Sequence, residues 1–364
     1  MKPDNIFYHW AQAVGKAFAP LSKPQALMLA AASLGVAQAR SCTLSRVAQK
    51  LFRLGSLPAV ERRLQRFLSN DKVDWQEGSL CLARWLLPAV LRGRGRRSTK
   101  PVVLLVDETA LQDHLKIMVV ALAWRGRALP LAWWCYPQDQ YPLPQVELID
   151  TLLGQVAAAL PPDLPVLVEA DRGIGCSPDL MAAVEQRHWY FLFRVQGSVR
   201  LDLGAGRQVS YAELIPHPSR CCAQAVRAFK KAGWVACRAL GYWKVGQEEP
   251  WLLLTNWPEA TTTDYATRMW EEAAFRDVKS NGFNWQRSHV YQPAHANRLW
   301  LILAVAYGWV VSLGQQVREQ TELFRQVAHG ARKRFSVFQL GLRWLELCLN
   351  QGEKLFYEPH FDYP

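Results

Sequence analysis

The sequence predicts an α/β protein in which an α-helical N-terminal domain precedes a core of alternating strands and helices. Three observations support this prediction. Residues 1–91 have the apolar spacing of amphipathic helices. Residues 101–109, PVVLLVDET, form a continuous apolar run that ends in acids, which is typical of a strand buried on both faces. From there to residue 195 the expected order is β-β-β-α-β-α-β.

Composition limits the kinds of partner. The chain has 364 residues, enough for two or three structural units, and half of them are hydrophobic. Its formal net charge of +12 favours a polyanionic partner, most simply nucleic acid, over the weaker alternative of a membrane surface. The eight cysteines form no C-x-x-C pair, which argues against a zinc ribbon or a disulfide framework and favours a reducing cytoplasm.

The N-terminal domain contains a candidate helix-turn-helix. Two amphipathic segments, residues 43–52 and 57–68, are separated by the short turn RLGS. Arg62, Arg63 and Arg66 fall on the second helix, where they can meet DNA phosphates or a groove. An ordinary helix pair with a solvated basic face fits the same residues. Residues 92–100, RGRGRRSTK, are expected to form a basic linker to the next domain.

The remaining elements are expected in the following order. Strands are predicted at 101–109, 116–124, 128–136, 164–170 and 189–195, and helices at 144–160 and 177–187. Short strand-like runs and glycine turns over about 196–262 indicate a β-rich insertion. The apolar run 299–314 is shorter than the ~18 residues that indicate a membrane span, so we expect a core helix. Residues 316–364 are expected to be a helical C-terminal region.

Two acids are placed where the first and fourth predicted core strands end. Asp107 ends the first and Asp171 follows the fourth, at the loop-side edge where open α/β sheets bind ligands. Side chains alternate along a strand, so Glu108 must face away from Asp107. Neighbouring carboxylates are costly unless a cation binds between them, and Mg²⁺ prefers such oxygen ligands. Taken singly, each acid also fits a turn residue or a helix cap.

A helix expected over residues 264–283 carries a polar stripe. At about 100° per residue, four of its side chains fall within one narrow wedge, with Arg276 close by and Glu271 off the line. The four are Tyr265, Arg268, Glu272 and Lys279. A solvated face with an ion pair at i,i+4 is the alternative interpretation.

These four residues satisfy the spacing Y-x2-R-x3-E-x6-K. The pattern resembles the YREK signature of the cut-and-paste DDE transposases of the insertion-sequence-four group. LVDET resembles the family segment that holds the first catalytic Asp, and ADRGIG the segment that holds the second. FRDVKSNGFNW, residues 275–285, continues the resemblance, which covers roughly residues 100–315.

The resemblance implies a ribonuclease H-like catalytic core at 101–315, with the β-rich insertion between the second Asp and the Glu. It implies that Asp107, Asp171 and Glu272 are the catalytic residues and hold two Mg²⁺ ions, with Mn²⁺ able to substitute. The remaining site residues are expected to contact DNA. They are Tyr265, Arg268 and Lys279 by motif match, Arg276 by geometry, and Trp257 as a candidate for stacking on a flipped base, unless it is simply packed.

The implied function is that of a DNA transposase. Such an enzyme binds double-stranded DNA at terminal inverted repeats, hydrolyses the transposon ends and joins the 3′ ends to target DNA. A homodimer on DNA, in the bacterial cytoplasm with the nucleoid, is expected. Two alternatives remain: a non-catalytic DNA-binding protein derived from a transposase, and a structure-specific nuclease on the same fold.

Overall fold

The computed structural model of the chain describes residues 3–92, 100–330, 334–352 and 355–361. Residues 93–99, which make up most of the predicted basic linker, lie outside the described residues, as do residues 331–333 of the basic stretch in the tail.

The N-terminal region is helical, as predicted. Its helices are α1 (Pro3–Ala17), α2 (Lys23–Ala39), α3 (Leu44–Lys50), α4 (Leu57–Ser69) and α5 (Trp75–Arg92). A short 3-10 turn, η1 (Phe52–Leu54), joins α3 to α4, so the predicted helix pair is present. Gly35 of α2 allows α3 to pack closely, because a Cβ there would lie 2.8 Å from the Val47 side chain.

The described strands form one mixed sheet in the order β3-β2-β1-β4-β5-β10-β9-β8-β6-β7. Its first half is built from β1 (Val102–Leu111), β2 (Leu115–Trp124), β3 (Arg127–Pro137), β4 (Val166–Ala170) and β5 (Tyr190–Arg194). β1, β4 and β5 run parallel, whereas β2 and β3 are antiparallel neighbours. The five strands predicted for the core are therefore confirmed, and with α6 (Gln145–Ala157) and α7 (Pro178–Glu185) the order is the expected one.

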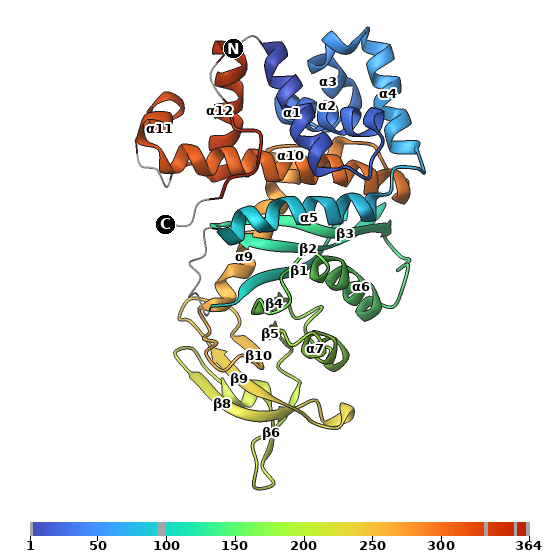
Figure 1. Ribbon diagram of the computed structural model, residues 1–364. Helices are drawn as coiled ribbons and strands as arrows, with labels where there is room; N and C mark the ends of the chain where they lie inside the picture. The colour runs from blue at the N-terminus through green and yellow to red at the C-terminus, as the bar shows by residue number, and fades with distance from the viewer. Residues whose placement is uncertain (1–2, 93–99, 331–333, 353–354, 362–364) are drawn as a thin grey trace.

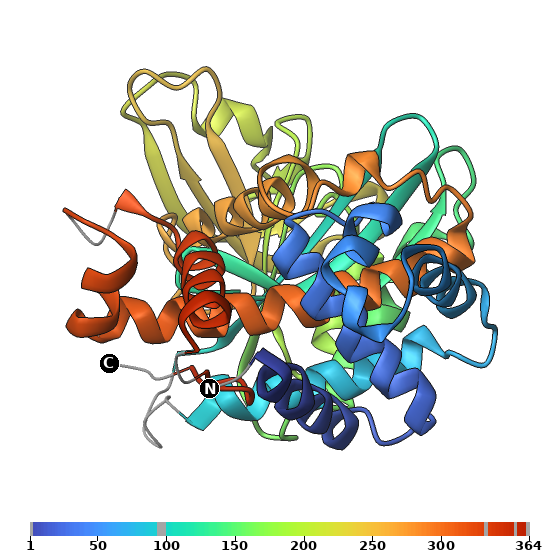
Figure 2. The same ribbon diagram turned by 90° about the horizontal axis from the view of Figure 1, so that it is seen from above.

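The insertion strands extend the same sheet. They are β6 (Arg200–Asp202), β7 (Gln208–Ser210), β8 (Cys221–Ala228), β9 (Val235–Tyr242) and β10 (Trp251–Thr255), with the short helix α8 (Tyr211–Leu214) after β7. β10 returns along β5 in antiparallel register and continues the sheet toward β9. Figure 2 shows this half projecting away from the helical region. The predicted β-rich segment is thus present and continuous with the core sheet.

A long apolar helix joins the sheet to the helical region (Figure 1). α10 (Pro293–Glu319) packs against β3 on one side and against α2 and α12 (Val337–Gln351) on the other. α11 (Thr321–Val327) connects α10 to α12. Among the individual helices in the described ranges, only α10 is long and apolar enough to cross a membrane. The apolar stretch of α10 is completely buried inside the protein.

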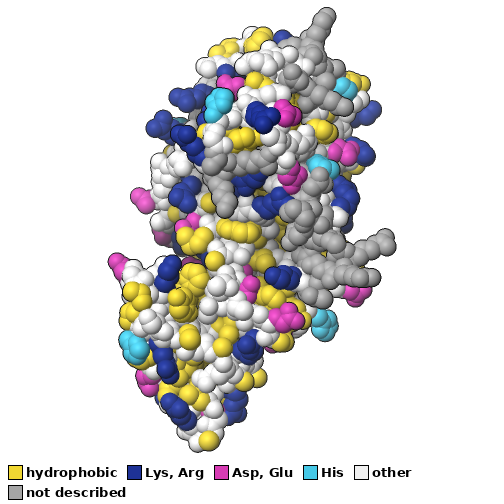
Figure 3. Space-filling model, turned by 90° about the vertical axis from the view of Figure 1, so that its left-hand side faces the viewer, with side chains coloured by type: hydrophobic (Ala, Val, Ile, Leu, Met, Phe, Trp, Pro, Cys, Tyr) yellow, Lys and Arg dark blue, Asp and Glu magenta, His cyan; other side chains and the backbone are white. Residues whose placement is uncertain are grey.

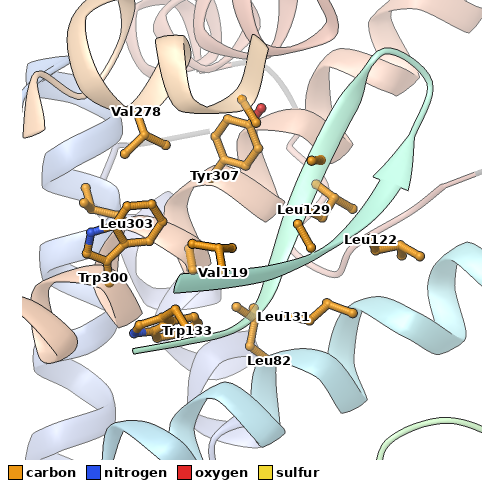
Figure 4. Packing of buried hydrophobic residues seen from close by; sticks show 14 of the residues in the cluster. Leu82, Val119, Leu122, Leu129, Leu131, Trp133, Val278, Trp300, Leu303 and Tyr307 are labelled. Atoms are coloured by element: carbon orange, nitrogen blue, oxygen red, sulfur yellow. The ribbon is translucent and has the colours of Figure 1, made fainter. Parts of the chain in front are cut away.

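The core beneath α10 is rich in large side chains. Figure 4 shows Trp300 and Leu303 of α10 beside Val119 of β2, with Tyr307 of α10 and Val278 above that strand. Trp300 and Tyr307 are almost fully buried. Close packing of this kind fixes the position of the segment that carries Val278 relative to the sheet.

The segment 264–281 is not the continuous α-helix that its sequence predicts. It consists of a 3-10 turn, η3 (Asp264–Arg268), an α-helix, α9 (Met269–Arg276), and a π turn, η4 (Asp277–Asn281); a further 3-10 turn, η5 (Trp285–Arg287), follows. Gly282 closes the π turn against Phe338, where a Cβ would lie 2.5 Å from the ring. Because 3-10, α and π helices differ in residues per turn, a stripe drawn at a uniform 100° does not hold here.

Candidate active site

The parallel register of β1 and β4 brings the two strand acids together. Val106 is paired with Ala170, so the next residues, Asp107 and Asp171, lie side by side. One detail of the prediction is wrong: Asp107 does not end its strand, because β1 continues to Leu111 in a hairpin with β2. Asp171 does follow the last residue of β4, as predicted.

Glu108 faces away from Asp107, as alternation requires. Its carboxylate accepts hydrogen bonds from the hydroxyls of Tyr136 and Tyr141 and forms an ion pair with Lys116 at 2.8 Å. The lysine and the two hydroxyls together outweigh the effect of burial and lower the pKa of Glu108. This acid is satisfied within its own cluster and takes no part in the site on the other face.

Each strand acid uses one oxygen for its own backbone turn. Asp107 Oδ1 accepts from the Glu108 backbone N–H at 2.9 Å. Asp171 Oδ1 accepts from the N–H groups of Gly173 and Ile174, at 2.9 and 3.1 Å. The remaining oxygen of Asp171 is left for a ligand, since these bonds fix the orientation of the carboxylate without occupying both oxygens.

Arg268 lies between the acids of the sheet and those of the helix. Its Nη2 is 2.7 Å from Asp107 Oδ2 and its Nη1 is 3.6 Å from Glu271 Oε2. Burial acts to lower the pKa of the guanidinium, but the carboxylates of Glu271 and Asp107 outweigh burial and raise it. Arg268 is therefore the internal counterion of the site.

The charge of Asp107 is poorly compensated despite this partner. Burial raises the pKa of Asp107 to about 6; Arg268 opposes the shift and the neighbouring Asp171 adds to it. A cation placed beside a carboxyl group with such a pKa stabilises its charged form.

Two further acids, Glu169 of β4 and Glu271 of α9, are enclosed near Arg268. Both are at most 1 % exposed, and no residue in the described part of the chain donates a hydrogen bond to any of their four carboxylate oxygens. Burial raises the pKa of each far above its usual range, and the charge of Asp107 adds to the shift of Glu271. Buried carboxyl groups without hydrogen-bond partners are costly, which marks this as a candidate functional region.

Glu272 is not brought into this cluster, whereas its neighbour Glu271 is. Its side chain is exposed on the solvent side of α9, and no ion pair or hydrogen bond links it to a described residue. Relative to Arg268, an α-helix places Glu271 at about −60° and Glu272 at about +40°. The two glutamate side chains therefore point to opposite sides of the direction of Arg268. Glu271 is buried because it lies on the same face of α9 as Ala274, the face that packs on the core.

Two other residues of the predicted stripe do reach the site. Lys279 is partly buried; burial lowers its pKa, and the nearby charge of Asp107 opposes that change. Tyr265 is buried, and its hydroxyl lies 3.5 Å from the Ala170 carbonyl oxygen, at the end of β4. Burial raises the pKa of Tyr265, so the hydroxyl stays protonated and can donate.

Two predicted DNA contacts lie elsewhere. Arg276, the last residue of α9, is exposed, and its charge acts on Asp277. The 3-10 turn before α9 breaks the uniform rotation that placed Arg276 close to the stripe. Trp257 is only 8 % exposed, with its ring 6.3 Å from that of Tyr190, and Arg238 donates to its carbonyl oxygen. Trp257 is therefore a packed tryptophan of the insertion, the second of the two interpretations that the sequence allows.

The arginines of α4 are on the surface. Arg62, Arg63 and Arg66 are exposed, although Arg63 also donates to the Leu54 carbonyl oxygen at 2.9 Å and so supports the turn before the helix. On the face drawn in Figure 3, Lys and Arg side chains are spread among acids over both halves of the molecule.

Two arginines beside the acids were not predicted from the sequence. Arg172 follows Asp171 directly, and Arg194 ends β5, with its charge acting on Tyr265. The segment ADRGIG could have indicated Arg172, since this cation directly follows the predicted site residue Asp171. No local pattern indicates Arg194, because only sheet pairing brings it near.

The carboxylates of Asp107 and Asp171 are side chains of the type that binds a divalent ion. Two carboxylates meet at one edge of the sheet, and hard oxygen donors are what Mg²⁺ binds. The described residues nevertheless include no group of three or more His, Cys, Asp or Glu side chains close enough to hold a metal ion as they stand.

Comparison with known proteins identifies a domain that covers much of the sheet. A search of curated proteins gives no match to the chain. A scan against protein families matches a region that begins after Asp107. This region contains Asp171, β4, β5, the insertion, α9 and most of α10. Residues 146–309 match the family model of the transposase DDE domain, and this part of the chain is therefore a DDE transposase domain.

Proposed function

We propose that the protein is a metal-dependent DNA transposase that binds terminal inverted repeats, hydrolyses DNA at the transposon ends and joins the 3′ ends to target DNA. A DDE transposase domain implies DNA transposition. The observation that carries the proposal is the pairing of Asp107 with Asp171 by strand register, with Arg268 and Lys279 against them.

The proposed metal ligands are Asp107, Asp171 and Glu272. Glu272 matches the motif spacing, and its exposure leaves it open to a hydrated ion and to DNA. Glu271 is sealed from solvent and paired with Arg268, so we assign it to positioning that arginine. When bound, a pair of Mg²⁺ ions activates the attacking oxygen and stabilises the leaving oxygen of phosphoryl transfer, and Mn²⁺ is expected to substitute.

The chain's own cations would orient the DNA phosphate. Arg268 offers a guanidinium, the fork of donors that suits phosphate oxygens, and Lys279 offers a point charge close to Asp107. The protonated hydroxyl of Tyr265 can donate a further bond at the end of β4. Away from the acids, the exposed arginines of α4 are proposed to bind phosphates of the end sequences, with two copies of the chain acting on two DNA ends in the cytoplasm.

The test is cleavage of a duplex that carries the inverted repeats flanking the gene. With Mg²⁺, the wild-type protein should cut this duplex, and chelation by EDTA should stop the reaction. Asp107→Asn, Asp171→Asn and Glu272→Gln should each abolish cutting while DNA binding persists. Glu271→Gln should keep measurable cutting, because its proposed task is indirect.

The result also separates the remaining alternatives. Loss of cutting in Glu271→Gln but not in Glu272→Gln would move the third ligand to Glu271. Cutting without joining of the 3′ end to a second duplex would identify a structure-specific nuclease. DNA binding without any cutting would identify a non-catalytic DNA-binding protein.

A further inference from the structure

Two arginines beside the candidate active site share a single carboxylate. Arg172 Nη1 is 2.7 Å from Glu249 Oε2, and Arg194 Nη2 is 3.0 Å from the same oxygen. Arg172 belongs to the turn after Asp171, Arg194 ends β5, and Glu249 lies in the connection between β9 and β10. Two guanidinium groups from separate elements thus converge on one oxygen atom.

The placement of both arginines is fixed by the fold. Gly175 closes the turn after Asp171 directly on the end of β5: a Cβ there would lie 2.7 Å from the Arg194 carbonyl oxygen and 2.9 Å from that of Asp171. Arg194 is also paired with Leu253 of β10. The backbone positions of the arginine pair (Arg172 and Arg194) are therefore fixed next to the acid that is proposed to bind metal.

The carboxylate that joins them is half-exposed. The side chains of Arg172 and Glu249 are 52 and 51 % exposed, and that of Arg194 is 23 % exposed. Ion pairs at this exposure are weak, because water screens both partners. Glu249 therefore behaves as a replaceable anion on two well-placed donors.

We propose that the arginine pair is a binding site for a DNA backbone phosphate and that Glu249 occupies it in the absence of DNA. The inference rests on the proposed function, since it takes DNA as the substrate. A phosphate oxygen accepts two converging N–H donors as a carboxylate oxygen does, and arginine forks suit it. The site extends the DNA path from Asp171 toward the insertion, and Glu249 acts as an internal competitor that lowers the affinity for DNA.

The experiment measures equilibrium binding of a fluorescein-labelled 30-base-pair duplex to the full chain over a series of salt concentrations, in EDTA so that no cleavage takes place. Arg172→Ala and Arg194→Ala should each weaken binding and reduce the slope of log K against log salt by about 0.9, the value for one phosphate contact. Glu249→Gln should tighten binding about three- to fivefold, because a competing surface ion pair is lost.

Glu248→Gln is the matched control. It removes the same charge from the neighbouring exposed residue, which forms no ion pair with a described side chain, and should change affinity less than twofold. The gain from Glu249→Gln should vanish when both arginines are alanine. Thermal unfolding of every variant checks that the fold is kept.

The outcomes distinguish this inference from the proposed function. A Glu249→Gln protein that binds no better than Glu248→Gln, or unchanged salt slopes in both arginine variants, overturns the phosphate site while DNA binding by the wild type still stands. A wild-type protein that binds no duplex at all overturns both.

Discussion

The strand acids and the helical segment 264–281 were equally visible in the sequence, but they differ in how the fold places them. Asp107 and Asp171 are held by strand pairing, in which register and alternation determine both position and direction. The direction of a side chain on the segment 264–281 depends on helical rotation, and there the helix type changes twice. The sequence can therefore identify the individual site residue on a strand. On a segment whose helix type changes, the sequence does not distinguish between two adjacent residues.

The largest effect should come from the strand acids. Asp107→Asn or Asp171→Asn should reduce DNA cleavage by roughly a thousandfold or more, because metal-assisted charge stabilisation is worth several kcal/mol. Single-turnover cleavage of the end-bearing duplex in Mg²⁺ measures this. Asp113→Asn, an exposed acid at the tip of the same β1–β2 hairpin, is the control and should cleave normally. Normal cleavage by the Asp107 variant would remove that residue from the site.

The attachment of the helical segment should be the next most sensitive feature. Asp277, which opens the π turn, pairs with Arg127 Nε at 2.6 Å and accepts from the Tyr307 hydroxyl at 3.3 Å, with 6 % exposure. Asp277→Ala leaves Arg127 buried without its partner and should lower the free energy of unfolding by about 3–5 kcal/mol. Urea unfolding measures the loss.

The control for that change is an exposed acid of the same chain. Glu259→Ala, before the segment, should alter the free energy of unfolding by no more than about 0.5 kcal/mol. Equal midpoints for the Asp277 and Glu259 variants would show that the π turn is not anchored through this pair.

These examples also show which parts of the molecule the sequence can predict. The apolar run 101–109 and the alternation of strands and helices were sufficient for β1 to β5, because burial on both faces leaves a local signal. The convergence of Arg194 with Arg172 was not predictable, since it depends on pairing between β5 and β10. The choice between stacking and packing for Trp257 could not be made from the sequence, because nothing local to it reveals its contacts with Arg238 and Tyr190.

The same limit explains the glutamates of α9. Their order along the chain is plain, but the choice of which one faces the sheet depends on the 3-10 turn before α9 and the π turn after it. Both turns are fixed by distant contacts: the 3-10 turn by that of Arg268 with Asp107, and the π turn by those of Asp277 with Arg127 and of Gly282 with Phe338.

The protonation of Asp107 should give cleavage a distinctive pH dependence. Its pKa is raised from 3.8 to about 6, so the fold favours the protonated form and this group lowers stability as pH rises between those values. Metal binding needs the carboxylate, so cleavage should fall about tenfold per pH unit below about 6. Raising Mg²⁺ should move the midpoint to lower pH, because the metal competes with the proton. A pH profile of cleavage with a midpoint near pH 4 that does not change with the Mg²⁺ concentration would contradict this.

The smallest effect is expected at the end of the helical segment. Lys279→Ala should weaken duplex binding several-fold and reduce the slope of log K against log salt by about 0.9, if the lysine neutralises one phosphate. Arg276→Ala, an exposed cation of the same segment that points away from the acids, should leave a slope closer to that of the wild type. Equal slopes for the two variants would show that nearness to Asp107 does not select phosphate contacts.

Binding of Mn²⁺ to the protein–duplex complex, followed by electron paramagnetic resonance, tests most directly whether Asp107 and Asp171 hold a divalent cation together. Wild-type protein should remove Mn²⁺ from the free-ion signal, and Asp107→Asn and Asp171→Asn should each lose most of this binding while Asp113→Asn keeps it. Unchanged Mn²⁺ binding in a protein that carries both substitutions would contradict the account.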